Sequence, residues 1–473
     1  MKLIPTIGIE MHCEMKSFTK VFSPARNTYS KHANNHVSEI DIALPGILPS
    51  LNKECIRKSI LMASILHCKL PQYIYFDRKN YYYPDLPKGY QITQSHEPIG
   101  VNGYIDVPYN DGVLRVDIHD IHLEEDTAKI EHLDTESLIN YNRAGVPLLE
   151  LVTDPVFHSK EEVIAFLEYI RSIYQYTDIS EADIRKGQIR CDVNISVGEE
   201  GGPFGTRVEI KGVDSFSNIQ KVIDIEVKRQ MDLINDGKSS SIEQETRRFD
   251  EANNRTIRMR GKVDAIDYKY FVEPNIPKIK LDEELVKEIT SNIVELPLSR
   301  MTRYKDLGIN DDVVKVLVRD RKISDYYDEV LKCSVDPIVL SNYVATNIMG
   351  YLSKKNIVID EFKIEPKDLG LLLNKLQKKE ISSKQAKEIF EATLNGDTTI
   401  LKELDNTATQ NSNTEELDGI VSNIIKNSPK QVEDYKNGRT NLFNYFVGQV
   451  MKETKGSANP EIVKDIISKY LKN

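Results

Sequence analysis

The sequence predicts an α+β protein in which a mixed domain comes first and helical domains follow. Short β-branched runs separated by Gly, Pro and Asn turns fill residues 1–293, and helical spacing is confined there to segments such as 159–174 and 217–235. Prolines at 274–277 and 297 mark a boundary, because the residue before a proline is pushed out of helical conformation. Beyond it the apolar residues recur at helical spacing.

The length of the chain also predicts several domains. Its 473 residues exceed what one hydrophobic core usually covers. After the first domain we expect a helical domain at 294–404 and a linker at 405–416, which is rich in Asn and Thr and has no apolar period. A helical tail at 417–473 completes the chain.

Composition excludes several classes of protein. The formal net charge of −10 argues against a protein that coats nucleic acid indiscriminately, so any such contact must be regional. The five cysteines form no CxxC pair, which fits a reducing compartment and offers no zinc site. No apolar run approaches the ~18 residues of a membrane span, and Glu10 and Glu14 interrupt the N-terminal apolar residues before a signal-peptide core forms. We therefore expect a cytoplasmic protein without a membrane partner.

Several predicted strands of the first domain carry acids on one face. Side chains alternate across a strand, so Glu10, His12 and Glu14 share the face opposite to the apolar residues of 7–13. The same period recurs at 122–126 and 190–195, and Glu150 lies within the apolar run 147–151. Acids gathered in one cleft repel each other unless something neutralises them, and a divalent cation that carries phosphate commonly does so. This pattern indicates nucleotide chemistry.

Mg²⁺ suits these candidate ligands, because it prefers hard oxygen donors and often keeps waters and substrate phosphates. The alternative is an ordinary solvated sheet face, which explains any one of these acids but not their repulsion as a set. Cys13 and Cys191 adjoin the acids, yet their strand parity places them among the apolar side chains. We therefore interpret them as buried structural cysteines and not as nucleophiles.

The segment FDRKNYYYPDLPKGYQITQ at 76–94 is dense in cations and aromatic residues. Such irregular backbone is typical of a substrate-binding loop, although a half-buried tyrosine cluster would have the same composition. Neither a P-loop nor a GxGxxG motif follows any predicted strand. Phosphates would therefore be held by a metal ion, Lys and Arg side chains and residues of the sheet.

The final segment is basic within an acidic chain. Residues 425–473 carry nine Lys or Arg against five Asp or Glu, a balance compatible with contact to a phosphate backbone or with a solvated helix face. Gly448 lies inside a helical pattern. A glycine there indicates the close approach of another helix or of an RNA strand.

Taken together, these stretches resemble the GatB family, the B subunits of the bacterial aspartyl/glutamyl-tRNA amidotransferase GatCAB. The resemblance covers almost the whole chain. It rests on motifs in the family's order: IGIEMH, LPGILPSLNKE, FDRKNYYYPDLPKGYQITQ, IHLEEDTAK, NRAGVPLLELVTDP, RCDVNIS, VEIK with SFSN, QETRRFDE, DYKYF, PKQVEDYKNG and VGQVMKETKG.

The resemblance implies a fold, a reaction and partners. The fold would be a cradle-like catalytic domain similar to glutamine synthetase, followed by a helical domain and a tRNA-binding tail. In the reaction, ATP phosphorylates the side-chain carboxylate of Glu-tRNA(Gln) or Asp-tRNA(Asn), and ammonia then displaces the phosphate to leave an amide. The chain would act as one member of a heterotrimer with an amidase A subunit, which supplies the ammonia, and a small C subunit.

The resemblance also implies roles for individual residues. His12, Glu125 and Glu150 match the family's Mg²⁺ ligands, with Glu10, Glu124 and Asp192 around a second, looser cation position. Glu10, His12, Lys79 and Glu125 would be catalytic, and Lys79 would lie beside the path of ammonia. The remaining assignments are Arg190, Asn194, Glu209 and Lys211 for substrate or ATP, and Gly448, Gln449, Lys452 and Lys455 for tRNA.

The chain departs from the family pattern at one place that matters for its cofactors. Most relatives carry two cysteine pairs for a structural zinc before the LPG motif, and this chain has Ser23, Ala25, Ser38 and Asp41 at those positions. We therefore expect ATP and Mg²⁺ as cofactors and no zinc.

Two alternatives remain to the amidotransferase. One is a non-catalytic tRNA-binding or assembly paralogue, which would have no need to retain mutually repulsive acids. The other is a stand-alone carboxylate-amine ligase that uses a free amino acid, which would leave the basic tail unexplained.

Overall fold

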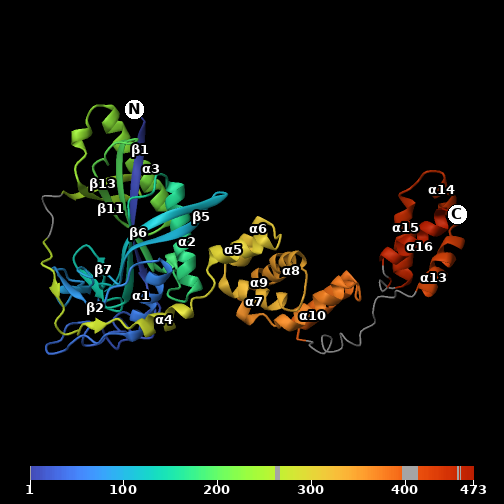
Figure 1. Ribbon diagram of the computed structural model, residues 1–473, viewed down its shortest axis with the longest axis horizontal. Helices are drawn as coiled ribbons and strands as arrows, with labels where there is room; N and C mark the ends of the chain where they lie inside the picture. Colours follow the sequence, from blue (N-terminus) through green and yellow to red (C-terminus); the bar gives the residue numbers. More distant parts are fainter. Residues whose placement is uncertain (1, 262–266, 397–413, 455–457, 459, 473) are drawn as a thin grey trace. The chain divides into compact units, whose positions relative to one another are not determined.

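The computed structural model describes residues 2–261, 267–396, 414–454, 458 and 460–472 (Figure 1). The chain divides into two compact units, Met1–Leu298 and Ser299–Asn473. We expected the first boundary at 293. It lies later because Ile293, Leu296 and Leu298 still pack against the hydrophobic core of the first unit.

An eight-stranded sheet forms the centre of the first unit (Figure 1). Only β11 and β12 pair in parallel, and the other neighbours are antiparallel. In spatial order the strands are β13 (Arg255–Gly261), β12 (Glu245–Asp250), β11 (Val208–Val213), β10 (Ile189–Glu199), β1 (Leu3–Glu14), β9 (Pro147–Thr153), β6 (Gly112–Glu125) and β5 (Gly100–Tyr109).

Three helices pack against this sheet: α1 (Lys53–Ile65), α2 (Lys160–Tyr176) and α3 (Phe216–Asn235). Each begins where a side chain, from Asn52, Ser159 or Ser215, accepts a hydrogen bond from a backbone N–H of the first turn. Their apolar faces share one core with the odd-numbered residues of β1 from Ile7 to Cys13, and with Cys191 of β10. The prediction that both cysteines are buried is confirmed.

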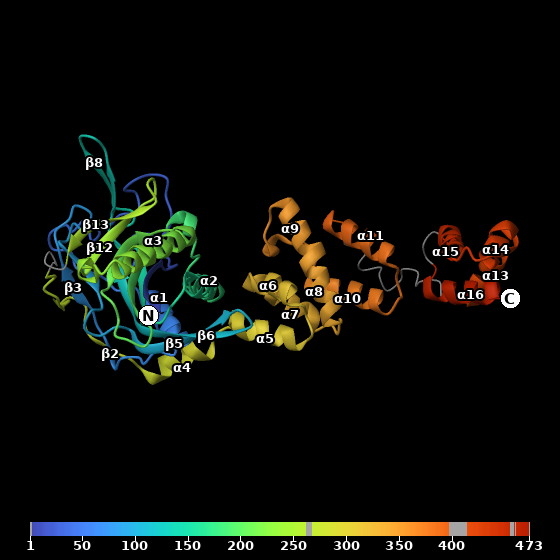
Figure 2. The ribbon, with the colours of Figure 1, turned by 90° about the horizontal axis from the view of Figure 1, so that it is seen from above.

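Smaller ribbons flank the large sheet. A three-stranded sheet joins β14 (Phe271–Val272), β3 (Asp77–Asn80) and β4 (Tyr90–Thr93). Two further pairs are β15 (Ile279–Lys280) with β2 (Tyr73–Ile74), and β7 (Lys129–His132) with β8 (Ser137–Asn140), which projects from the unit in Figure 2. Helix α4 (Glu283–Ser291) packs against α1.

The described part of the second unit is helical and contains two separate hydrophobic clusters. The N-terminal hydrophobic core of this unit is built by α5 (Pro297–Asp306), α6 (Asp311–Val318), α7 (Arg321–Leu331), α8 (Pro337–Tyr343), α9 (Met349–Lys355), α10 (Pro366–Gln377) and α11 (Ser383–Leu394). Leu369, Leu372 and Leu373 share the buried face of α10, as helical spacing predicts.

Four helices build the C-terminal hydrophobic core of this unit: α13 (Thr414–Lys426), α14 (Pro429–Lys436), α15 (Leu442–Glu453) and α16 (Pro460–Lys472). The expected linker at 405–416 is too long at its end, because α13 already begins at Thr414. Its part at 405–413 lies outside the described residues. Within the described ranges, no helix is long and apolar enough to cross a membrane.

The large sheet with its packed helices, followed by helices alone, confirms the expected mixed fold.

Candidate active site

Strand pairing gathers four polar side chains in one row across the large sheet. His12 of β1 lies opposite Arg190 of β10 on one side and opposite Glu150 of β9 on the other. Glu150 in turn lies opposite His122 of β6. Residues directly opposite each other on antiparallel strands project from the same face. This face is the one that the core side chains of β1 leave free.

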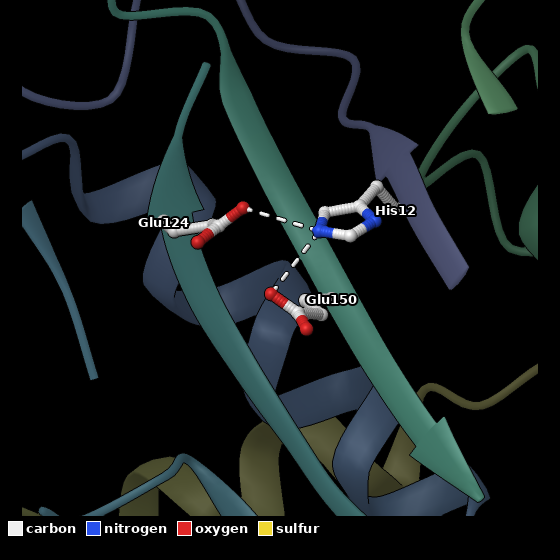
Figure 3. Close-up of side chains that lie close together, drawn as sticks. All are labelled: His12, Glu124 and Glu150. Atoms are coloured by element: carbon white, nitrogen blue, oxygen red, sulfur yellow. Dashed lines mark ion pairs between the residues drawn. The ribbon is translucent and has the colours of Figure 1, made fainter. Parts of the chain in front are cut away.

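Two carboxylates converge on the His12 imidazole (Figure 3). The Nε2 atom of His12 lies 3.2 Å from Oε2 of Glu150 and 3.7 Å from Oε1 of Glu124. One ligand atom from each of the three residues lies within 4.8 Å of the others. We call this group, which β1, β6 and β9 supply, the first cluster.

His122 extends the first cluster on the far side of Glu150. Its Nε2 lies 3.0 Å from Oε2 of Glu150, and its Nδ1 lies 2.8 Å from Oδ1 of Asp120. We did not assign His122 a role from the sequence, although the period of two that joins it to Glu124 was visible there. Both of its ring nitrogens face carboxylates, which favours the doubly protonated, positive imidazole.

The charges of the first cluster balance internally. Burial opposes the charge of His12, but Glu150 and Glu124 outweigh it and raise the pKa of the imidazole to about 9. Burial, and then the charge of Glu150, raise the pKa of the Glu124 carboxyl group. Burial also acts against the Glu150 carboxylate, but His122 and His12 hold its pKa well below the usual value. Protonated imidazoles thus serve as counterions to the acids.

Lys79 reaches the first cluster from the loop that we expected to bind substrate. Burial opposes the charge of Lys79, but Glu124, Tyr270 and Glu150 outweigh it and raise the pKa of its ammonium group. Its Nζ lies 5.0 Å from the ring centre of Tyr268. The three-stranded sheet therefore brings a cation to the two acids.

Glu125 does not belong to the first cluster, contrary to our expectation. It follows Glu124 on β6, and successive side chains of a strand point to opposite faces. Its carboxylate pairs with the ammonium group of Lys88 and accepts a hydrogen bond from the backbone N–H of Ile92 at 2.9 Å. Glu124 takes the position beside His12 that the resemblance gave to Glu125.

A second group of acids lies on the same face, one row further along β1. Glu10, Asp192 and Glu209 place one oxygen each within 4.8 Å of the others. Lys211 bridges this second cluster, with its Nζ 2.7 Å from Asp192 and 2.7 Å from Glu209. The amide of Asn194 donates to Glu10 at 2.8 Å. We expected Glu124 in this second cluster and Glu209 among the substrate-binding residues. In the structure, Glu124 lies in the first cluster and Glu209 joins the second.

Burial raises the pKa of the Glu10 carboxyl group. It opposes the charge of Lys211, but Asp192 and Glu209 outweigh it and raise the pKa of that ammonium group. Arg190, which we expected to bind substrate, instead donates to Asp126 at 2.8 Å. The positive charge that neutralises the second cluster is therefore the ammonium group of Lys211.

The donors of the first cluster fit a divalent cation. Two carboxylates and one imidazole are ligands that Mg²⁺ accepts, and they leave coordination positions for water or phosphate. A bound cation would replace the positive charge that the imidazole carries without it, so binding would release a proton.

Comparison with known proteins identifies the family of the chain. The family described as the GatB/GatE catalytic domain matches residues 5–287, and a second family, described as the GatB domain, matches residues 325–471. The chain belongs to the GatB family. It is 38% identical over 469 residues to the B subunit of the aspartyl/glutamyl-tRNA(Asn/Gln) amidotransferase of Limosilactobacillus reuteri, with 99% of this chain and 98% of the relative covered.

Two further members of the family are similar over nearly their whole length. The corresponding protein of Carboxydothermus hydrogenoformans is 39% identical, with 98% of this chain and 97% of the relative covered. That of Persephonella marina is 38% identical over the full length of both chains, at 100% coverage of each. The match therefore includes the helical unit as well as the sheet.

The loop before the LPG motif carries a buried ion pair. The ammonium group of Lys20 lies 3.0 Å from Oδ2 of Asp41, with side-chain exposures of 0% and 2%. It also donates to the carbonyl of Tyr141, beside the β7–β8 hairpin, at 3.2 Å. Ser23 and Ser38 contribute buried hydroxyls without a hydrogen-bond partner among the described residues. A hydroxyl pair, the methyl of Ala25 and a carboxylate already paired with Lys20 do not fit a tetrahedral zinc site.

The predicted tRNA-binding residues lie on or near α15. Gly448 and Lys452 are exposed and are four positions apart, so they share one face of this helix, and Gln449 is half-buried. A Cβ atom built at Gly448 meets no described atom within 4 Å. Close packing against another described helix is therefore not the reason for the glycine. Lys455 lies outside the described residues.

Proposed function

We propose that this chain is the transamidating B subunit of an aspartyl/glutamyl-tRNA(Asn/Gln) amidotransferase. It would phosphorylate the side-chain carboxylate of Glu-tRNA(Gln), Asp-tRNA(Asn) or both with ATP, and then amidate the acyl phosphate with ammonia. The first cluster, with Lys79 beside it, is the observation that carries the proposal. A non-catalytic paralogue would gain nothing from burying acids that must be neutralised by two imidazoles and a lysine.

Magnesium has a place in this proposal. His12, Glu124 and Glu150 would hold the ion, which would screen the negative charge of the ATP phosphates when bound. The second cluster of Glu10, Asp192 and Glu209 would serve as the looser cation position once Lys211 moves aside. The large sheet and its flanking ribbons would form a cradle similar to that of glutamine synthetase.

The chain's own residues would position the reactants. Lys79 would hold the substrate carboxylate or the transferred phosphoryl group by its charge, so that the attacking oxygen stays close to phosphorus. Glu125 and Lys88 pair on the opposite face of β6 from the first cluster, and Glu125 would hold β4 in place through the backbone N–H of Ile92. Arg190 would support the site through Asp126, and Asn194 would orient Glu10.

Partners follow from the chemistry. The chain would need an amidase A subunit for ammonia and a small C subunit, and its relatives, which are named as one lettered component of an amidotransferase, support an assembly of several subunits. Its mischarged tRNA substrates belong to translation, so we place the protein in the cytoplasm.

The proposal is tested by ATP hydrolysis in the assembled complex, measured with and without mischarged tRNA. We expect hydrolysis to depend on Glu-tRNA(Gln) or Asp-tRNA(Asn), because their side-chain carboxylate is the phosphoryl acceptor. Equal hydrolysis with correctly charged Gln-tRNA(Gln) would contradict the proposal, since that tRNA offers no acceptor.

The tail would bind tRNA through the exposed face of α15. A leucine at position 448 would find open space, so Gly448→Leu should leave the stability of the tail unchanged and weaken tRNA binding roughly tenfold by obstructing the RNA. Gly419→Leu on α13 is the matched control, since a Cβ atom there also meets nothing within 4 Å. Equal tRNA affinity of both variants would show that Gly448 lies outside the RNA contact.

We also propose that the protein contains no structural zinc and that the Lys20–Asp41 pair fastens the loop in its place. Elemental analysis of the purified complex should find no zinc that this chain holds. One zinc per chain would refute this part of the proposal.

A further inference from the structure

Three tyrosines form a surface beside the first cluster that the proposed chemistry does not yet use. Tyr81 follows β3, and Tyr268 and Tyr270 precede β14. The ring centres of Tyr81 and Tyr268 are 5.8 Å apart, and those of Tyr268 and Tyr270 are 6.0 Å apart, both in edge-to-face contact. We call these three rings the tyrosine shelf.

The backbone holds the shelf in place. The N–H of Asn80 donates to the carbonyl of Tyr268 at 3.0 Å, and the Asn80 amide donates to the carbonyl of Lys269 at 2.8 Å. Strand β14 pairs with β3 so that Phe271 lies opposite Arg78. Continuing this register puts Tyr270 opposite Lys79, and residues opposite each other share a face. The shelf is thus a fixed extension of the three-stranded sheet.

Strand β4 connects the shelf to the first cluster. Its Gln91 lies opposite Lys79 of β3, and two residues further along, the hydroxyl of Thr93 donates to Glu124 at 3.4 Å. The Nζ of Lys79 lies 5.0 Å from the ring centre of Tyr268. Burial raises the pKa of the Tyr270 hydroxyl. The charges of Glu150 and Glu124 raise it further, and the charge of Lys79 lowers it.

The rings themselves remain accessible. Tyr270 is 38% exposed and Tyr268 is half-buried. Within the described residues, the hydroxyls of these two tyrosines make no hydrogen bond, so neither ring is fixed there by its polar end. Exposed aromatic faces next to a cation are the surfaces on which nucleobases stack.

We propose that the tyrosine shelf binds the purine ring of an adenosine whose charged end lies at the first cluster. This inference rests on the proposed function, which offers two sources for that adenosine. One is ATP, whose phosphates would lie at the cluster. The other is the 3′-terminal adenosine of the tRNA, whose ester-linked amino acid would place its carboxylate there.

Two probes distinguish the sources by equilibrium titration of the assembled complex. The first is the Mg²⁺ complex of a non-hydrolysable ATP analogue. The second is an adenosine that carries glutamate through a stable 3′-amide, which imitates the end of Glu-tRNA. Ribose 5-triphosphate, which has no base, is the reference ligand for the first probe, and the free glutamate amide without adenosine is the reference for the second.

Tyr268→Leu and Tyr270→Leu remove the rings, and Tyr268→Phe and Tyr270→Phe keep them. We expect each Leu variant to bind one of the two probes about tenfold more weakly, and the Phe variants to restore affinity to within about twofold. Affinity for the base-free references should not change, which also verifies that the site is folded. Tyr29→Leu, at a ring that is 81% exposed and outside both the shelf and the 76–94 segment, is the matched control.

Loss with the ATP analogue would assign the shelf to ATP, and loss with the glutamyl adenosine would assign it to the tRNA end. Unchanged affinity of the Leu variants for both probes, or an equal loss for the base-free references, would overturn the shelf while wild-type transamidation leaves the proposed function standing. Absence of wild-type transamidation would overturn the proposed function and the shelf with it.

Discussion

The two acid clusters lie on neighbouring rows of one sheet face but are neutralised by different cations. In the first cluster the imidazoles of His12 and His122 flank Glu150. In the second cluster the ammonium group of Lys211 bridges Asp192 and Glu209. A bound cation can displace the proton of the His12 imidazole, whose pKa is about 9, whereas the ammonium group of Lys211, whose pKa is raised above its usual value, keeps its charge.

This difference teaches how the clusters would respond to Mg²⁺. The first cluster can accept a cation by releasing a proton and leaving its side chains in place. The second can accept one only if Lys211 withdraws, which costs two ion pairs. We therefore expect the first cluster to bind Mg²⁺ more tightly and to contribute more to catalysis.

The largest expected effect compares one acid from each cluster. Glu150→Gln should reduce transamidation roughly 10³-fold, because it removes the carboxylate that both imidazoles and the cation share. Glu209→Gln should reduce it roughly tenfold, since Asp192 still pairs with Lys211. Glutaminase activity of the partner subunit, measured in the same complexes, should persist in both. Similar losses in the two variants would remove the distinction between the clusters.

The next effect separates two adjacent residues of β6. Glu124→Gln should raise the Mg²⁺ concentration needed for half-maximal transamidation by roughly 10- to 100-fold, because it removes a ligand of the first cluster. Glu125→Gln should leave this Mg²⁺ midpoint unchanged, since Glu125 faces Lys88. A shift of the midpoint in the Glu125 variant alone would restore the ligand set that the family resemblance implied.

A smaller effect concerns stability without metal. Lys211→Met leaves the second cluster without its cation, and we expect the free energy of unfolding to fall by about 1–2 kcal/mol in denaturant titrations, less than for a fully buried pair because the Lys211 side chain is 38% exposed. Saturating Mg²⁺ should recover more of this loss than it adds to the wild-type protein. Lys228→Met, in a surface pair on α3, is the control and should change stability by less than about 0.5 kcal/mol.

If Mg²⁺ stabilises the Lys211 variant no more than the wild-type protein, the second cluster does not bind the ion at all.

The smallest effect concerns Glu14, which continues the row of Glu10 and His12 without a histidine or lysine of its own. Burial, and then the charge of Asp126, raise the pKa of its carboxyl group to about 7 from the usual 4.5. The native state therefore binds this proton more strongly than the unfolded chain, and its stability falls as the pH rises from about 4.5 to about 7.

Glu14→Gln should abolish that fall. The variant should be as stable as the wild-type protein at pH below 4.5 and more stable at pH above 7, as measured by urea unfolding across this range. We expect a difference of about 1 kcal/mol, less than the full shift would give, because the Glu14 side chain is only partly buried and water screens its charge. Lower stability of the variant than of the wild-type protein at pH above 7 would mean that the sign of the shift is opposite.

The sequence predicts well which side chains lie on the polar face of the sheet. It predicts less well which of these side chains lie next to one another. Strand alternation placed Glu10 and His12 on one face and buried Cys13. The same alternation favours Glu124 over Glu125 as a neighbour of His122, whereas the family resemblance suggested Glu125. The clusters depend on which strands are adjacent, since Glu150 meets His12 and His122 only through the order β1, β9, β6. No local pattern contains that order.

The same limit applies elsewhere in the chain. The domain boundary lies after Leu298 because apolar residues beyond the prolines pack back on the first core, a long-range contact that proline positions do not reveal. The buried pair of Lys20 and Asp41 could not be predicted either, because only the folded loop brings the two residues together. In the sequence, a lone Lys or Asp is typical of an exposed surface position. Helical spacing, by contrast, is local, and it correctly predicted a helical domain after the boundary, where α10 and α11 bury the apolar residues that recur at that spacing.

The central claim is that this chain activates a carboxylate with ATP at the first cluster. The most direct measurement supplies the complex with Glu-tRNA(Gln) whose side-chain carboxylate carries the heavy isotope of oxygen, and follows the label by mass spectrometry of the released phosphate. Because ammonia displaces a phosphate that was joined to a substrate oxygen, we expect one labelled oxygen to appear in phosphate for each amide formed, and roughly 10³-fold less of both products in Glu150→Gln. Amide formation with unlabelled phosphate would contradict the account.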